Sequence, residues 1–269
     1  MLPQDAFLRA MPRAIDLESR LRFEAIVTSV DIIDLAYRRL TDVLTRLARC
    51  SDVLAVISDA RVDVTTHCWT IIDHLHNLRE LTKKSQEYDE WVATFTASIE
   101  PATLMRNAMD HLSGRLGNFS QTKGSALPMH GCISFAASTE DGFEWIQLAL
   151  GAPHHTQQHS AAIDMWMVAP TNTVDHINFA AFNDQLDFSR VVTELRELIT
   201  GLNEAFETHV HEQAQQTATK NNIDVNKLLA DRVTGTFFFR IRTRSSEPGT
   251  IKPDQASLEP RVDNGGIPG

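Results

Sequence analysis

The stretch that decides the fold is residues 26–47, IVTSVDIIDLAYRRLTDVLTRL. Its large apolar residues recur at alternating spacings of four and three: Ile26, Val30, Ile33, Tyr37, Leu40, Leu44 and Leu47. This spacing places side chains on one stripe of an α-helix, as in a helix buried along one side of a bundle. Gly and Pro are absent from 16–50. We therefore expect one long helix that starts at Asp16 and ends near residues 50–52.

Further helices are expected on the C-terminal side of this stretch. A buried stripe predicts a second helix over 64–84, whereas the apolar residues 53–57 fit either a strand or a helical turn. A short helix is expected over 90–99. The next helix should begin at Pro101, because proline is favoured in the first turn, and should end at 114–117.

The pattern then changes from helical spacing to β-rich and turn-rich sequence. Two strand-like runs, 132–136 and 143–148, flank the turn 139–142 and predict a hairpin. The runs 163–168 and 176–180 predict a second strand pair. A long helix with Asp187 as its N-cap follows, since apolar residues recur at bundle spacing from Phe188 to Phe206.

Together these elements predict a mainly α fold. It is a bundle of about four principal helices with a small antiparallel β insertion before the last long helix. The expected organisation is a flexible arm (1–14), the bundle (15–212) with its β-rich insertion (129–182), a C-terminal helix and strand extension (213–244) and a disordered tail (245–269).

Composition restricts the function classes. The chain has 269 residues, 42% hydrophobic and 22% charged, with a net charge of −10. No apolar run is long enough for a membrane span, and the N-terminus lacks a signal-peptide pattern. The negative charge disfavours broad binding to DNA or RNA backbones. Three scattered cysteines predict neither disulfides nor a zinc site, so we expect a cytoplasmic protein.

The residues most suggestive of chemistry lie together in 105–112, MRNAMDHL. On a helix its apolar residues share one side. The opposite side carries the polar candidates Arg106, Asn107, Asp110 and His111. Arg106 and Asp110 are four residues apart, as are Asn107 and His111, so the polar groups form two adjacent ridges. The apolar side would fix this helix in a core and leave the polar side for chemistry or a partner.

The pattern Arg106-Asn107-x-x-x-His111 resembles the signature of the HEPN superfamily, in which a bundle helix carries Arg, often Asn, and then His. The resemblance covers this one helix directly. It implies a metal-independent endoribonuclease that acts on RNA as a homodimer with the two motif helices facing each other. Other HEPN proteins keep the fold as toxin partners, ligand binders or scaffolds, which allows an antitoxin-like protein partner.

The chemistry of these side chains is compatible with RNA cleavage without a metal or cofactor. His111 can act as acid or base near neutral pH, and the Arg106 fork can stabilise the charge of a phosphorane. Asn107 would position a phosphate, a ribose or His111. Asp110 either joins the site or pairs with Arg106 and holds the site closed. Since one helix supplies one histidine, acid and base would come from two copies.

The alternative is a non-catalytic bundle whose polar helix face binds a protein partner or a small ligand. The two interpretations differ in geometry. Catalysis predicts that Arg106 and His111 are at least partly exposed beside their dimer mates. An Arg106 locked to Asp110 or Asp73 and closed off from solvent favours the binding module.

The remaining histidine clusters are weaker candidates. One cluster lies on the second helix and consists of His67, Asp73, His74 and His76. It suggests either a metal site between helices or a solvated helix face. We favour the solvated face. His154, His155 and His159 lie in a polar loop without a fixed scaffold. They predict a flexible loop better than a zinc site.

Aromatic residues offer two possible RNA contacts. Trp145 and Trp166 could form a stacking platform for a base, but packing within the core or the sheet is the interpretation that we favour. Residues 237–244 mix phenylalanine with arginine, as an RNA-contacting or sheet-docking strand does. The motifs GxxxxGK[ST], GxGxxG, HExxH and GxSxG are absent, so the common nucleotide-binding and hydrolase classes have no support.

Overall fold

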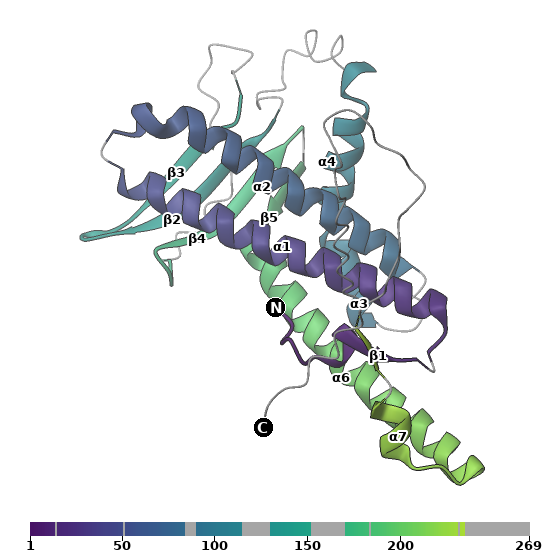
Figure 1. The fold of residues 1–269 in the computed structure, drawn as a ribbon. Helices are drawn as coiled ribbons and strands as arrows, with labels where there is room; N and C mark the ends of the chain where they lie inside the picture. The colour runs from purple at the N-terminus through teal and green to yellow at the C-terminus, as the bar shows by residue number, and fades with distance from the viewer. Residues whose placement is uncertain are drawn as a thin grey trace, which may run out of the picture. The chain divides into compact units, whose positions relative to one another are not determined.

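The computed structural model confirms the predicted fold class: the chain is mainly helical, with a four-stranded antiparallel sheet before the last long helix (Figure 1). The structure describes residues 1–13, 15–50, 52–83, 90–114, 130–151, 170–182, 184–230 and 232–234. Two units are distinguished, Met1–Val233 and Thr234–Gly269, and of the second only Thr234 is described. The predicted strand 237–242 and the tail 245–269 lie outside the described residues.

The elements are η1 (Phe7–Arg9), β1 (Ala10–Pro12), α1 (Leu17–Arg49), α2 (Val53–Thr82), α3 (Glu90–Ser98), α4 (Glu100–Asp110), β2 (Cys132–Thr139), β3 (Gly142–Ala149), β4 (Val174–Ala181), β5 (Asp184–Asp187), α6 (Phe188–Asn221), α7 (Val225–Ala230) and β6 (Arg232–Thr234). The helices α1 to α4, the strands β2 to β4 and the long helix α6 follow one another in the predicted order, whereas η1, β1 and β5 were not predicted.

The long helix α1 follows its sequence signal at both ends. The Asp16 side chain accepts a hydrogen bond from Ser19 N at 2.9 Å and caps the helix. The apolar stripe is buried, with Val30, Ile33 and Leu40 fully inaccessible. Helix α2 begins at Val53 rather than at 64, so the ambiguous stretch 53–57 is helical. β-branched residues lower helix propensity only slightly, and no Gly or Pro separates this stretch from the predicted helix.

The sheet has the strand order β3-β2-β4-β5 with antiparallel neighbours. The predicted hairpin is confirmed, because β2 pairs with β3 from Cys132 opposite Ala149 to Thr139 opposite Gly142. The predicted pairing of 163–168 with 176–180 is wrong for β4, which pairs with β2 and β5 instead. Residues 163–168 lie outside the described residues. The short strand β5 carried no signal, since four residues are too few to show an alternation.

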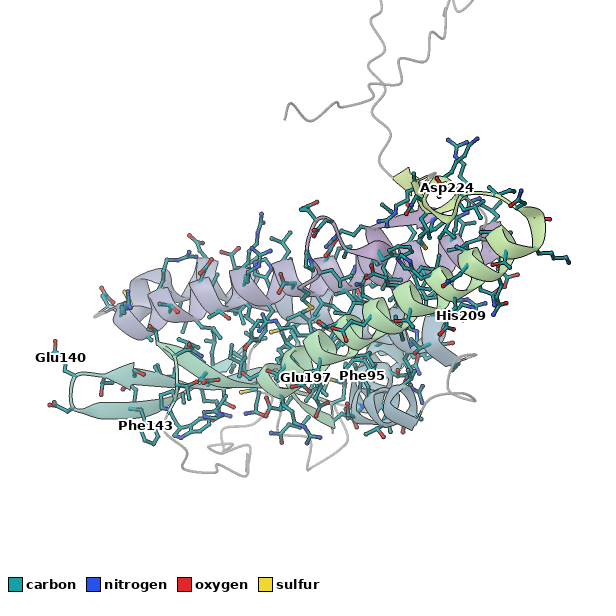
Figure 2. The ribbon with its side chains drawn as sticks, turned by 90° about the horizontal axis from the view of Figure 1, so that it is seen from below. Phe95, Glu140, Phe143, Glu197, His209 and Asp224 are labelled. Carbon is teal, nitrogen blue, oxygen red and sulfur yellow. The ribbon has the colours of Figure 1, made fainter. Side chains whose placement is uncertain are left out.

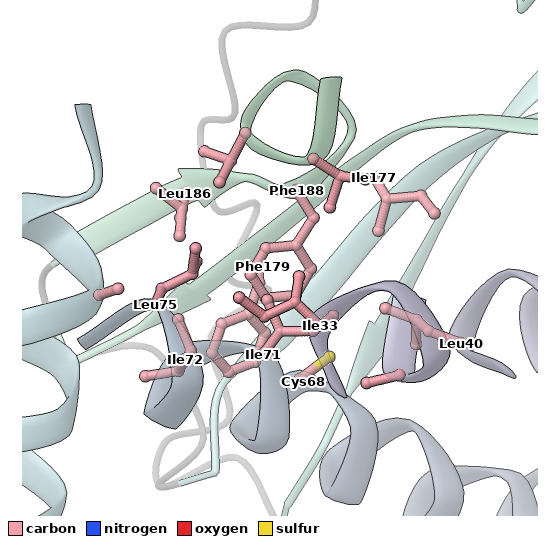
Figure 3. Close-up of a cluster of buried hydrophobic side chains, with 14 of the residues drawn as sticks. Ile33, Leu40, Cys68, Ile71, Ile72, Leu75, Ile177, Phe179, Leu186 and Phe188 are labelled. Atoms are coloured by element: carbon pink, nitrogen blue, oxygen red, sulfur yellow. The ribbon is translucent and has the colours of Figure 1, made fainter. Parts of the chain in front are cut away.

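The hydrophobic core lies between the sheet and the helices. Figure 3 shows Phe179 of β4 directed toward Ile33 of α1 and Ile71 of α2. The Phe179 ring stacks on Phe188 of α6 with centroids 5.6 Å apart and meets the edge of Trp69 at 5.7 Å. One strand thus anchors three long helices.

The N-terminal residues contradict the expected flexible arm. Phe7 and Leu8 are buried, and Leu8 N donates to the Asn203 side chain at 3.0 Å. The strand β1 pairs with β6, and the Arg232 guanidinium lies 4.2 Å from the centre of the Phe7 ring. These contacts reach residues far away in sequence, so the short, proline-flanked segment gave no local sign of order.

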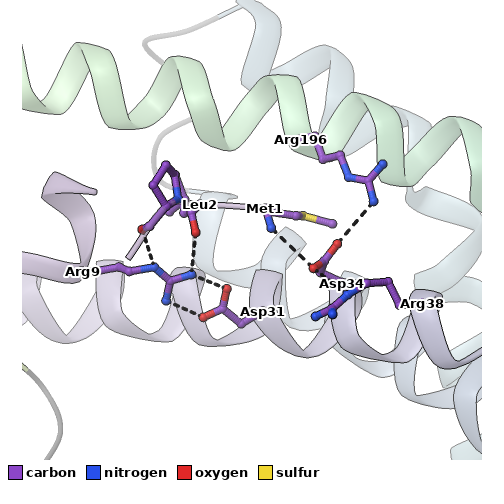
Figure 4. Close-up of polar contacts among 8 residues, drawn as sticks. Met1, Leu2, Arg9, Asp31, Asp34, Arg38 and Arg196 are labelled. Carbon is purple, nitrogen blue, oxygen red and sulfur yellow. Dashed lines mark hydrogen bonds and ion pairs between the residues drawn. The ribbon is translucent and has the colours of Figure 1, made fainter. Parts of the chain in front are cut away.

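Two aspartates of α1 fasten this N-terminal segment (Figure 4). Asp31 forms a two-pronged ion pair with Arg9 at 2.6 Å for each contact. The buried Asp34 carboxylate binds the Met1 ammonium at 3.4 Å, Arg38 at 3.2 Å and Arg196 of α6 at 3.3 Å. The Asp34 cluster therefore ties α1 to α6 as well as to the first residue.

Helix α6 continues to Asn221, nine residues beyond the predicted end of the bundle at 212. Helix α7 lies beside this part of α6 (Figure 2) and buries Val210 and Leu229 in a small cluster. The turn between them uses Asn222 in the left-handed region, at φ +53°, as the helix cap. The polar sequence remains helical because α7 covers its few apolar residues.

Candidate functional site

The predicted motif helix is α4. Most of its apolar side is buried, but Leu104, which the sequence pattern assigns to that side, is exposed. Pro101 lies in the first turn, and Ala102, Met105 and Ala108 face the core. The helix contacts α2 and β5. It ends at Asp110, earlier than the predicted 114–117, so His111 is its C-cap and not a helical residue. The His111 backbone N–H bonds to Asn107 O at 3.3 Å, and this closes the last turn.

Three polar contacts join α4 to the antiparallel helix α2 in one regular ladder. The Arg106 Nε atom lies 2.7 Å from Asp73 Oδ1. One step further, His76 Nδ1 lies 3.3 Å from Thr103 Oγ1, and Arg79 Nη2 lies 3.3 Å from Glu100 Oε1. Each step of three residues along α2 matches a step of three in the opposite direction along α4. Arg106 is therefore the first rung of an interhelix ladder.

The Arg106 guanidinium lies between two carboxylates. Besides Asp73 it contacts Asp110, four residues later on α4. The hydrogen bond that Arg106 donates to Asp110 raises the pKa of Arg106; burial opposes this change, and the charges of Asp73 and Asp110 add to it. The Arg106 side chain is 32% exposed, against 49% for Asp73 and 52% for Asp110. The three groups together carry one net negative charge.

The other two motif residues lie apart from this cluster. Asn107 and His111 are exposed, and their positions on α4 place them on the ridge next to that of Arg106 and Asp110. Among the described residues, neither side chain is in hydrogen-bonding or ionic contact with Arg106. Leu104, 47% exposed, precedes Asn107 by three residues on the same side. Within one chain, the side chains of Arg106 and His111 are therefore not in direct polar contact.

The histidines of α2 do not form a metal site. Within the described residues no group of His, Cys, Asp and Glu side chains is arranged to hold a metal ion. Burial lowers the pKa of His67 and His74, with nearby aspartates opposing the change. His76 is used in the ladder. His154, His155 and His159 lie outside the described residues.

The predicted aromatic platform is only partly within the described structure. Trp145 lies beside His176 of β4, with ring centroids 6.1 Å apart. Trp166 and the basic aromatic stretch 237–244 lie outside the described residues. The sequence analysis missed His176, whose backbone has φ +50°, and no local pattern marks such a conformation.

The ladder itself was also missed, although its signal is present in the sequence. Polar residues recur every three positions at Asp73, His76 and Arg79 and again at Glu100, Thr103 and Arg106. Opposite charges occupy both ends once the two helices are set antiparallel. The pairing becomes evident only when the register of α2 against α4 is known.

No described helix combines the length and the apolar character needed to cross a membrane. Comparison with known proteins gives no match to a family model, to a curated protein or to a solved structure.

Proposed function

We propose that this chain is a HEPN-like helical-bundle protein that acts as a non-catalytic binding module. The observation that carries the proposal is the position of Arg106 between Asp73 and Asp110, as a rung of the ladder that holds α4 to α2. A guanidinium used in this way stabilises the packing of two helices. It is not held ready for a phosphate.

The local charge supports this proposal. A phosphate that approaches Arg106 meets two carboxylates for one guanidinium, so the net field repels it. Exposed ion pairs contribute only about 0–1 kcal/mol each, and a phosphate could displace one carboxylate. The second carboxylate would remain next to the bound phosphate and would repel it. The protein's net charge of −10 adds to this repulsion.

The exposed ridge of α4 is the proposed contact surface. Leu104, Asn107 and His111 follow one another at spacings of three and four, which places them on one side of the helix end. An apolar anchor beside hydrogen-bonding side chains is typical of a protein interface. We propose a second copy of this chain as the occupant, in agreement with the homodimer that the HEPN resemblance implies.

Metal-independent RNA cleavage is the second candidate. It is favoured by the exposure of Asn107 and His111 and by the third of the Arg106 side chain that remains accessible. In a dimer, Arg106 would stabilise the phosphorane, Asn107 would position the strand, and His111 of each copy would serve as acid or base. Asp110 would then act as the group that holds Arg106 until RNA competes.

The test is incubation of a mixed single-stranded RNA pool in EDTA with the wild type and the variants His111→Ala, Arg106→Ala and Arg79→Ala. Arg79→Ala is the matched control, because it removes a ladder arginine outside the motif. The proposal predicts no cleavage by any of the proteins. Cleavage that leaves 2′,3′-cyclic phosphate ends, is lost in His111→Ala and Arg106→Ala and persists in Arg79→Ala would establish the ribonuclease instead.

The surface is tested separately by the oligomeric state. Light scattering coupled to gel filtration should show a dimer for the wild type and a monomer for Leu104→Asp, which buries a charge in the proposed interface. Leu17→Asp, at another exposed leucine, should remain dimeric. A monomeric wild type, or a dimer that Leu104→Asp leaves intact, would contradict the proposed occupant.

A further inference from the structure

A cluster of polar atoms without partners lies on the outer face of the sheet, away from α4. Ser134 Oγ, Trp145 Nε1 and His176 Nε2 are buried and have no hydrogen-bond partner within the described part of the chain. The side chains of Ile133, Phe135 and Ala137 fill the core, so the alternate residues of β2 face the other way. Trp145 is opposite Ala136, and Ser134 is two residues along the same face.

The backbone of β4 is distorted at the residue that completes this cluster. The pairing of β2 with β4 shifts register between Ser134 and Ala136, which marks a bulge. Within it His176 adopts φ +50°, a conformation that is strained for a non-glycine residue and occurs often at binding sites. The bulge turns the His176 ring to within 6.1 Å of Trp145, with 31° between the ring planes.

Neighbouring side chains hold His176 in this conformation from both sides. Asp175 Oδ1 accepts a hydrogen bond from His176 N at 2.8 Å. Asn178 Nδ2 donates to His176 O at 3.0 Å. Asp175 is held in turn, since its Oδ2 accepts from the Thr171 hydroxyl at 2.7 Å. The backbone of His176 is therefore held by neighbouring side chains, while the Nε2 atom of its ring has no hydrogen-bond partner among the described residues.

The chemistry of the unpartnered atoms defines what would satisfy them. An indole N–H can only donate, whereas a serine hydroxyl and an imidazole nitrogen can donate or accept. A buried polar group without a partner destabilises the fold, so a ligand that supplies the missing hydrogen bond gains affinity. A ligand that offers acceptor atoms at the edge of a flat ring would relieve all three. Flat rings also stack favourably on tryptophan and histidine.

The charges on this face exclude a strongly anionic ligand. The described residues on the outer face include the carboxylates of Asp175 and Asp187 but no lysine or arginine. We propose that the outer face, at Ser134, Trp145 and His176, binds an uncharged planar heterocycle of the nucleobase class. Trp145 and His176 are half-buried, so part of each ring is accessible to a ligand.

The site uses neither Arg106 nor α4, so it is independent of the function proposed above. It is tested by calorimetric titration of the full chain with adenosine, guanosine, cytidine and uridine. At least one nucleoside should bind with a Kd below about 1 mM. Trp145→Phe keeps the ring and removes the donor, and Ser134→Ala removes the hydroxyl. Each should weaken binding about tenfold.

Trp69→Phe is the matched control, because the Trp69 N–H already donates to His130 O at 3.3 Å. It should leave the affinity unchanged. The 5′-monophosphates should bind more weakly than the nucleosides. Binding of a single-stranded RNA oligomer alone, with the same two losses, would assign the base to an RNA strand. The proposal is overturned if neither nucleosides nor the oligomer bind, or if both site variants bind as the wild type does.

Discussion

Replacement of Arg106 tests whether this residue holds two helices together. Arg106→Met keeps much of the apolar stem and removes the guanidinium from Asp73 and Asp110. Both carboxylates are about half exposed, so each ion pair is worth about 0.2–1 kcal/mol after solvent screening. We therefore expect Arg106→Met to lower the free energy of unfolding by about 1 kcal/mol. Arg106→Ala also removes the stem and should cost about 2 kcal/mol.

The assay is urea denaturation followed by far-UV circular dichroism, at low salt and in about 1 M NaCl. The loss in Arg106→Met should fall by half or more at high salt, because the screening length is then about 3 Å. Arg79→Met removes a single ion pair at 3.3 Å and should cost about 0.5 kcal/mol. A double-mutant cycle with Asp73→Asn isolates the pair across the helices.

Two results would refute the ladder. One is a coupling energy between Asp73 and Arg106 below about 0.3 kcal/mol, within the error of additivity. The other is an Arg106→Met variant as stable as the wild type or more stable. Residues kept for catalysis often cost stability, so a stabilising replacement would favour the ribonuclease.

Replacements of Gly131, Asp34 and Ser189 test the packing of the fold, and Gly201→Ala is the control for the first of them. Gly131→Ala should lower the free energy of unfolding in urea by at least about 2 kcal/mol, because Gly131 has φ +93° and a Cβ would lie 2.7 Å from Ala180 O. In the control Gly201→Ala nothing lies within 4 Å of the new Cβ, so this replacement should stabilise helix α6 by about 0.5–1 kcal/mol. Equal effects of the two replacements would contradict the close contact at Gly131. Asp34→Asn should cost about 1–2 kcal/mol at pH 7. Burial raises the pKa of Asp34, but the Met1 ammonium, Arg196 and Arg38 outweigh burial, so the folded pKa is lowered. The stabilisation by Asp34 is therefore present above the unfolded pKa of about 4 and is lost as the pH falls through the lower folded pKa. A stability difference between wild type and Asp34→Asn that persists at about pH 2 would show that the carboxylate charge is not its origin. Ser189→Ala should lower the free energy of unfolding by about 1–3 kcal/mol, because the Ser189 hydroxyl accepts a hydrogen bond from Ile177 N at 2.9 Å and lies 3.0 Å from the Tyr37 hydroxyl. A decrease below about 0.5 kcal/mol, measured by thermal or urea unfolding, would mean that water replaces the hydroxyl.

The sequence determined the elements that depend on neighbours along the chain. The apolar spacing of 26–47 and the capping aspartates at 16 and 187 located α1 and the start of α6. The turn at 139–142 located the β2–β3 hairpin. The amphipathic pattern of 105–112 predicted which side of α4 is buried. Each of these signals arises from local geometry, namely helix period, cap and turn, and so can be derived from sequence alone.

Only the tertiary structure decided which residues of these elements contact one another. The spacing of Arg106 and His111 is visible in the sequence. The ion pair between Arg106 and Asp73 depends on the antiparallel register of α2 against α4. The order of residues 1–12 depends on β6 and Asn203, nearly two hundred positions away. The His176 bulge depends on how β4 meets β2. These contacts join segments that are distant in sequence, so even the three-residue recurrence of the ladder residues identifies no partner until the register of the two helices is known.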